Sequence, residues 1–224
     1  GGDAPYTYLW SGGLGTGQTA TPPTSSAGTI NYTVTVKDAN GIAVSDNNNV
    51  TVVPESVGGS VSSDQAICLG SIPRDLTLSG ETGSVIYWQS AADPAFTSPV
   101  NIANTTTTLS GASMGLLTAT TYFRAVVKNG SCANVYSSAA AITINTTTWT
   151  GSWSNGVPSS TTSVIISANY TPASSFECCS LTVNNNAAVL IPSGINVTLN
   201  GKLTVVSGSS FTLQSNANLI QTTN

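Results

Sequence analysis

The sequence has no histidine and very little charge. Only 6% of its 224 residues are Asp, Glu, Lys or Arg, against roughly 25% in ordinary soluble domains. Without histidine the chain cannot build a Ser-His-Asp or Cys-His catalytic arrangement or a histidine metal site. Five basic residues and a net charge of -4 leave no surface that neutralises phosphates, so we expect no nucleic-acid binding.

Long apolar runs are also missing. No run approaches the roughly 18 apolar residues that cross a bilayer, and no charged segment with an apolar stretch marks a signal peptide. We therefore expect no transmembrane segment and interpret the chain, which lacks an initiator Met, as a mature piece of a longer protein. Four cysteines in a lysine-poor, Thr- and Asn-rich chain suit an exported, extracellular protein better than a cytosolic one.

The nine acidic residues are scattered over predicted loops and turns. Hydrolysis by paired carboxylates needs two acids at one site, so we expect no enzyme, no catalytic residues and no cofactor. Calcium is the one cation left open. The run SDNNN (residues 45–49), with Asp38 on the neighbouring hairpin, offers oxygens but only two carboxylates. A polar turn is the alternative interpretation of this run.

The residues that are abundant favour β structure. Thr, Val and Ile are plentiful and helix formers are few, which predicts an all-β protein with many turns. In residues 1–53 an apolar alternation at Ile30, Tyr32 and Val34 precedes a DANG turn, as in a β-hairpin. Only about four of the roughly seven strands of a sandwich are found there. We expect the others upstream of this segment, with Trp10 packed inward.

Residues 54–145 form a second predicted unit. Cys68, Trp88 and Cys132 follow the Cys, Trp, Cys order of an immunoglobulin-type sandwich. This order favours a disulfide between Cys68 and Cys132, worth roughly 4 kcal/mol in the chain-entropy model, with unpaired buried thiols as the alternative. The adjacent Cys178 and Cys179 either form a vicinal disulfide or place one side chain in the core and the other outside.

Residues 146–224 repeat with a period of 22 residues. SLTVNNNAAVLIPSGINVTLNG (180–201) aligns with KLTVVSGSSFTLQSNANLIQTT (202–223). This self-similarity predicts a β-solenoid, a parallel β-helix-like fold with coils of about 22 residues. Two coils are too few for a stable solenoid, so we expect the repeat to continue. The alignment matches Leu181 with Leu203, Val183 with Val205, Val189 with Phe211, Ile191 with Leu213 and Val197 with Leu219.

The segment TTTWTGSWSNGVPSS (146–160) precedes the repeat. We expect it to form an atypical first coil that covers the open end of the solenoid. Its two tryptophans, Trp149 and Trp153, are either core residues or platforms on which glycans stack. Trp10 and Trp88 have the same two interpretations, and for all four the core is favoured.

Several stretches resemble modules of one class of protein. GGDAPYTYLWSGG (1–13) followed by AGTINYTVTVKDANG (27–41) resembles the SprB-type repeat, related to PKD domains, of Bacteroidetes gliding-motility and surface adhesins. It departs from that pattern at Ile42, where the family commonly has a cysteine. Residues 58–145 look like the Ig-like modules of the same large secreted proteins. Residues 148–205 are similar to the solenoid-like segment that often precedes the sorting signal of type IX secretion substrates.

The resemblance implies two Ig/PKD-like β-sandwich modules (1–53 and 54–145) followed by the start of a β-solenoid (146–224). It further implies a non-enzymatic structural or adhesive segment of a large bacterial adhesin, at the outer-membrane surface, acting in attachment or gliding motility. The expected partners are adjacent modules of the same chain, extracellular surfaces or glycans, and type IX secretion or outer-membrane components. The alternative is a set of carbohydrate-binding accessory modules of a secreted glycan-degrading enzyme.

Overall fold

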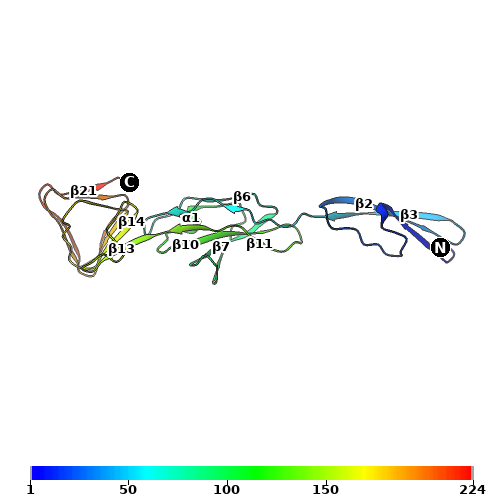
Figure 1. Cartoon of the computed structure of the whole chain (residues 1–224), viewed down its shortest axis with the longest axis horizontal. Helices are drawn as coiled ribbons and strands as arrows, with labels where there is room; N and C mark the ends of the chain where they lie inside the picture. Colours follow the sequence, from blue (N-terminus) through cyan, green and yellow to red (C-terminus); the bar gives the residue numbers. More distant parts are fainter. Residues whose placement is uncertain (1, 223–224) are drawn as a thin grey trace.

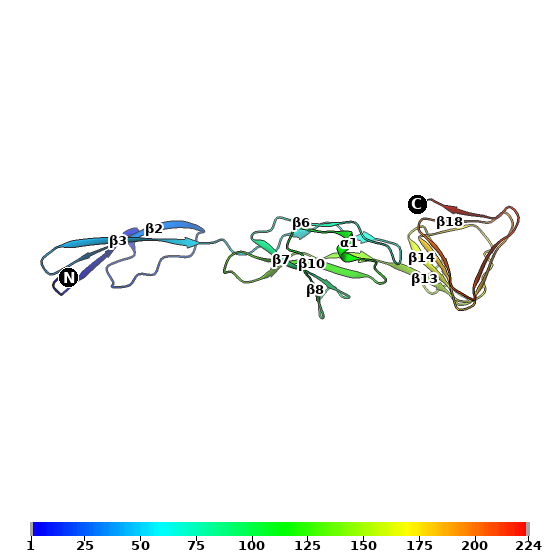
Figure 2. The same ribbon diagram turned by 180° about the vertical axis from the view of Figure 1, so that it is seen from behind.

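A computed structural model of the chain describes residues 2–222 (Figure 1). Strands hold 46% of the residues and helices 3%, which confirms the all-β class. The sheets form three groups that follow one another along the long axis of the molecule (Figures 1 and 2). We call these groups the N-terminal unit (2–53), the middle unit (54–144) and the C-terminal unit (145–222). Within residues 2–222, no helix has the length and apolar character needed to cross a bilayer.

The N-terminal unit is a single antiparallel sheet in the order β1-β2-β3. The β2–β3 hairpin closes at the predicted DANG turn, where Gly41 adopts a φ of 79°. Asp38 supports this turn, because its Oδ1 accepts hydrogen bonds from the backbone nitrogens of Asn40 and Ile42, both at 2.9 Å. The strands are β1 (Thr7–Trp10), β2 (Gly28–Lys37) and β3 (Ala43–Val52), with a short 3-10 turn, η1 (Ser11–Gly13), after β1.

The two faces of this sheet differ in chemistry. One face carries Thr, Ser and Asn side chains that hydrogen-bond across the hairpin, for example Thr29 with Thr51 at 2.8 Å. The opposite face carries Tyr32, which is buried, but also Ile30 and Val44, which are 51% and 69% exposed. Trp10 lies on this apolar face, opposite Val34, and its Nε1 donates to the carbonyl oxygen of Gly17 at 2.9 Å. The sheet therefore has one apolar face that is only partly covered.

The middle unit has two sheets around one core. The larger has the order β5-β12-β10-β7-β8, with β11 also paired to β10, and the smaller has the order β4-β6-β9. One turn of helix, α1 (Gly111–Met114), is capped by the Ser110 hydroxyl. The strands are β4 (Ser60–Val61), β5 (Gln65–Ala66), β6 (Leu76–Ser79), β7 (Ser84–Ala91), β8 (Val100–Ile102), β9 (Thr108–Leu109), β10 (Thr121–Lys128), β11 (Val135–Tyr136) and β12 (Ala140–Thr143).

The core of the middle unit surrounds Trp88, which is fully buried on β7. Its indole Nε1 donates to the carbonyl oxygen of Thr106 at 3.0 Å, so the polar atom is satisfied inside the core. The alternation of β6 sends Leu76 and Leu78 inward, against Trp88 and Phe123 of the larger sheet. Period-two patterning thus builds a core between the two sheets.

The C-terminal unit consists of parallel strands in three ladders. Its ribbon has a triangular outline at one end of the molecule (Figure 1). The first ladder is β13 (Asn145–Trp149), β14 (Thr162–Ile166), β16 (Ser180–Val183) and β19 (Leu203–Val205). The second is β15 (Phe176–Cys178), β18 (Asn196–Leu199) and β21 (Asn218–Gln221), and the third is β17 (Ala188–Ile191) and β20 (Ser210–Leu213).

The 22-residue alignment predicted the pairing of these strands. All five residue pairs matched in the sequence are partners across parallel ladders, for example Leu181 with Leu203 and Val189 with Phe211. Eight of these ten side chains belong to one apolar cluster, whereas Val205 and Leu213 are each 41% exposed. Asn185, in the corner before β17, has a φ of 55°, a conformation that asparagine tolerates better than most residues. Stacked apolar positions and polar corners therefore define this unit.

Candidate functional sites: a cross-linked junction and an aromatic groove

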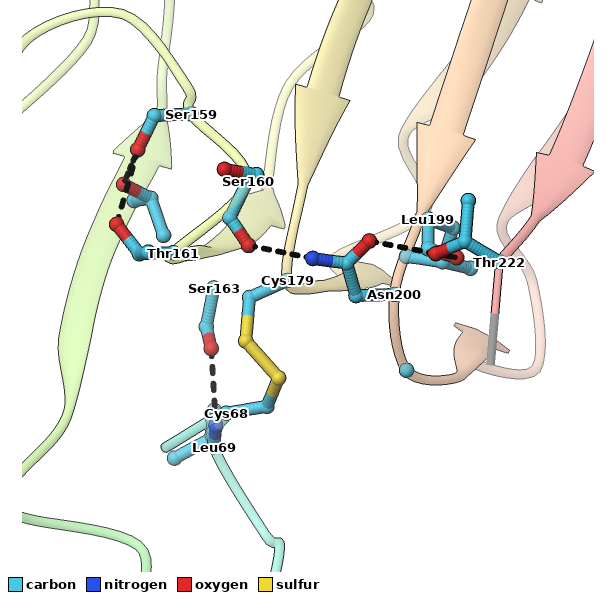
Figure 3. The surroundings of a disulfide bond; sticks show 12 residues. Cys68, Leu69, Ser159, Ser160, Thr161, Ser163, Cys179, Leu199, Asn200 and Thr222 are labelled. Atoms are coloured by element: carbon cyan, nitrogen blue, oxygen red, sulfur yellow. Dashed lines mark hydrogen bonds between the residues drawn. A yellow bond between two sulfur atoms is a disulfide. The ribbon is translucent and has the colours of Figure 1, made fainter. Parts of the chain in front are cut away.

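A disulfide joins the middle unit to the C-terminal unit. Cys68 pairs with Cys179, 111 residues further along the chain, with their Cα atoms 5.5 Å apart (Figure 3). The predicted bond between Cys68 and Cys132 is therefore wrong. The vicinal bond between Cys178 and Cys179 is also wrong, because Cys179 is already paired and Cys178 is a free thiol.

Strand direction explains why Cys132 cannot reach Cys68. β5 runs parallel to β12, and Cys68 follows β5 at the end of the sheet where the chain enters the C-terminal unit. Cys132 follows β10, which runs antiparallel to β12, so it lies at the opposite end. There its Sγ is 3.6 Å from the carbonyl oxygen of Pro54. A strand of eight residues separates the two ends, roughly 25 Å, whereas a disulfide needs Cα atoms within about 7 Å.

Further contacts brace the junction. Only Ile144 separates β12 from β13, so the chain passes from one unit to the next without a flexible linker. The backbone nitrogen of Leu69 donates to the Ser163 hydroxyl at 2.9 Å (Figure 3). Gly201 lies against the disulfide, since a Cβ there would be 2.8 Å from the carbonyl oxygen of Cys179. Two covalent connections and this close packing restrict hinge motion between the units.

The two free thiols have different environments. Cys178 is buried in the core of the C-terminal unit, and burial raises its pKa from 9.0 to about 12. Because the thiolate is the reactive form, the raised pKa and the burial of Cys178 keep it protonated and poorly nucleophilic at neutral pH. Cys132 is partly exposed. The sequence alternative that placed one of the adjacent cysteines in the core and the other outside it describes Cys178 correctly, and Cys179 faces the middle unit.

Four aromatic rings cluster at the start of the C-terminal unit. The ring centroids of Trp149 and Trp153 are 5.1 Å apart, and those of Trp153 and Tyr170 are 5.2 Å apart. Trp149 also contacts Tyr170 at 4.8 Å, and its Nε1 donates to the carbonyl oxygen of Asn169 at 3.0 Å. Phe176 completes the cluster, 6.2 Å from Tyr170. All four rings pack against the buried core of the unit.

One side of this cluster lines an open groove of about 460 Å³. The groove lies between the loop that contains Trp153 and the segment from Tyr170 to β15, with Glu177 and several serines among its lining residues. Of the two tryptophans proposed for glycan stacking, Trp153 lines the groove and Trp149 does not. Tyr170, Phe176 and Glu177 were not predicted as site residues, because the 22-residue alignment begins only at residue 180, although Phe176 pairs with Val197 in the second ladder.

The residues considered for calcium do not converge. SDNNN (45–49) is neither a loop nor a turn but part of β3, where successive side chains point to opposite faces. Asp46 faces the same side as Val34, whereas Asn47 hydrogen-bonds to Asn31 on the other side. Across residues 2–222, no cluster of three or more Cys, Asp or Glu side chains could hold a metal ion. The polar-turn alternative is wrong, because the run lies in β3.

A comparison with known protein families finds a match in the middle unit. The fold and the junction define an all-β chain of consecutive units with a disulfide between two of them. A family model described as a domain of unknown function (DUF8696) matches residues 57–146. This range runs from just before β4 into the first residues of β13. No curated protein matches the chain.

Proposed function

We propose that the chain is a non-enzymatic structural and adhesive segment of a large bacterial cell-surface protein. In this proposal it is exported by type IX secretion and acts in surface attachment or gliding motility. The observation that carries the structural part is the disulfide between Cys68 and Cys179, which joins consecutive units. Such bonds persist in oxidising surroundings outside the cytosol, which supports an extracellular location.

The disulfide sets the path of mechanical load. Tension applied along the chain enters the middle unit near residue 54 and reaches Cys68 after β4 and β5. From there it crosses the disulfide to Cys179 and continues into the second half of the C-terminal unit. Residues 69–178, which include the Trp88 core and the aromatic cluster, are bypassed by this covalent path and cannot be drawn out into extended chain while the bond is intact. The segment therefore extends less under load than it would without the bond.

The sandwich and solenoid assignments belong to the same proposal. The two sheets around Trp88 support an Ig-like middle unit. The parallel ladders with a 22-residue offset support a β-solenoid. The N-terminal sheet, with one polar face and one apolar face that includes Ile30 and Tyr32, has the chemistry of half a PKD-like sandwich.

Attachment under flow tests the structural role. In cells that carry the full-length protein, we expect the Cys68→Ser/Cys179→Ser variant to attach normally at rest and to detach at lower shear than wild type. Cys132→Ser is the matched control, because it removes a thiol that forms no disulfide. Equal shear resistance of the double variant and the control, at equal surface levels of protein, contradicts the proposal.

A second candidate is supported by the groove beside Trp153. An aromatic groove with serines and one carboxylate suits the carbohydrate-binding accessory region of a secreted glycan-degrading enzyme. The two candidates differ in their dependence on the disulfide. An accessory region holds its polysaccharide equally well at rest and under flow, with or without the bond between Cys68 and Cys179.

A further inference from the structure

We propose that the groove beside Trp153 binds a saccharide that is neutral or carries an amine. The proposal rests on the adhesive part of the proposed function and names the site and the ligand class. The site consists of Trp153, Tyr170 and Phe176 as the aromatic wall and Glu177 as the charged group.

The aromatic wall provides the apolar contact. Trp153 and Tyr170 meet nearly edge to face, with an interplanar angle of 74°, and Tyr170 and Phe176 meet at 72°. Each ring is only partly buried, so the cluster is anchored in the core on one side and lines the groove on the other. The C–H faces of a pyranose ring fit such surfaces, because aromatic side chains offer large, rigid apolar area.

Polar groups lie in the same groove. The alternation of β15 turns Cys178 into the core and leaves the Glu177 carboxylate exposed. Ser160 and Ser174 belong to the lining as well. A volume of about 460 Å³ falls within the roughly 300–1,000 Å³ of small-molecule sites. Apolar rings beside a few oxygen acceptors and donors match the two kinds of surface on a sugar.

Charge selects the class of sugar. Glu177 and Lys202 are the only charged residues between positions 145 and 222. Glu177 lines the groove, while the Lys202 ammonium lies on the junction side, 4.0 Å from where a Cβ of Gly70 would be. The groove thus holds one negative charge and no cation among its lining residues. It repels uronates and other acidic sugars, accepts neutral sugars, and pairs with a protonated amine.

An extended peptide fits the site less well. β15 is the outer strand of the sheet β15-β18-β21, so one of its edges is free for strand addition. However, it has only three residues, which limits a peptide to a few main-chain hydrogen bonds. A ligand held through ring faces and hydroxyls matches the groove better, so a saccharide fits this site better than a peptide.

Titration calorimetry with the whole chain tests the proposal. The probes are cellotetraose, a fully deacetylated chitosan tetramer and tetragalacturonate. We expect the first two to bind and the third not to bind. Trp153→Ala is expected to weaken both bound ligands at least tenfold. Glu177→Gln is expected to weaken the amine-bearing tetramer about tenfold and cellotetraose much less, because only the former pairs its charge with the carboxylate.

Matched controls separate binding from folding. Lys202→Gln removes the other charge of the unit, which is not among the lining residues of the groove, and should leave all three affinities unchanged. Thermal unfolding of each variant monitors the fold. If Trp153→Ala unfolds the unit, the selective effect of Glu177→Gln still decides the question, since this side chain is exposed.

Three results would overturn the proposal: no binding of either expected sugar, equal binding of tetragalacturonate, or binding unaffected by both groove variants. Capture of extended peptides from a displayed library, competed by no sugar, would assign the groove to strand addition instead. Loss of shear resistance in the disulfide variant with no sugar binding would leave the structural role standing and remove the saccharide site. Sugar binding as expected, with unchanged shear resistance in the disulfide variant, would keep the saccharide site and remove the structural role.

Discussion

Opening the disulfide between Cys68 and Cys179 should double the length of chain that tension can extend. The perturbation is reduction by dithiothreitol or the Cys68→Ser/Cys179→Ser double variant. The bond bridges 111 residues in sequence and 5.5 Å in space. An extended chain spans about 3.4 Å per residue, so the oxidised protein hides about 380 Å of chain from an applied force.

The same loop length sets the thermodynamic effect. In the chain-entropy model, closing a loop of this size lowers the entropy of the unfolded chain enough to stabilise the native state by about 5 kcal/mol. If one unit unfolds while the other stays folded, the stabilisation is smaller than this value, because fewer residues of the loop are then free. We expect reduction to lower the unfolding temperatures of both the middle and the C-terminal unit.

The assay is single-molecule force spectroscopy on the whole chain, with handles at the two ends. Oxidised wild type should show a total contour-length gain about 380 Å shorter than the reduced protein or the double variant. Cys132→Ser should behave as wild type, because its thiol is unpaired. Equal contour lengths in oxidising and reducing buffer would refute the cross-link. A shortened contour retained by Cys179→Ser alone would show that Cys68 pairs elsewhere.

Four further predictions concern the cores and the free thiols. Trp88→Ala should destabilise the middle unit by about 3–5 kcal/mol in urea unfolding, because it empties a fully buried site; a loss below 1 kcal/mol would show that Trp88 is not the centre of the core. Leu181→Ala should destabilise the C-terminal unit by about 2–5 kcal/mol, whereas Leu190→Ala, at a side chain 36% exposed, should have little effect; similar losses would contradict the inward assignment. Ellman's reagent at pH 8 should label Cys132 and leave Cys178 unlabelled until denaturant is added. Because folding raises the pKa of Cys178 to about 12, its contribution to stability is complete below pH 9 and is lost as the pH rises toward 12. Between pH 9 and 12, the free energy of unfolding of the wild type should therefore fall more steeply with pH than that of Cys178→Ala.

The patterns that depend on neighbouring residues were predicted well. Alternating apolar residues predict β2, the DANG turn closes its hairpin, and the 22-residue repeat identifies the partners of Leu181 and Val189. These features are local or periodic, so each follows from spacing along the chain. The prediction for the run SDNNN was wrong, because its composition suggested a turn or a cation site. Its pairing with β2 makes it a strand.

For the residues of the aromatic groove, too, the sequence predicts one part and packing decides the rest. Trp153 was identified as a candidate because tryptophan is conspicuous in a sequence, but its separation from Trp149 is a matter of packing. Trp149 donates its Nε1 to the carbonyl oxygen of Asn169 and is not among the residues that line the groove, while Trp153 lines it together with Tyr170. No spacing rule joins Trp153 to Glu177, since the two come from different loops and strands.

The sequence by itself determined the all-β class, the alternation of the strands and the period of the parallel ladders, because all three are written in the order of apolar and polar residues. Only the tertiary structure decided the disulfide. Counting cysteines allows several pairings, and the choice depends on which end of the middle unit each one occupies. The parallel pairing of β5 with β12 places Cys68 against Cys179, and the antiparallel course of β10 carries Cys132 to the far end.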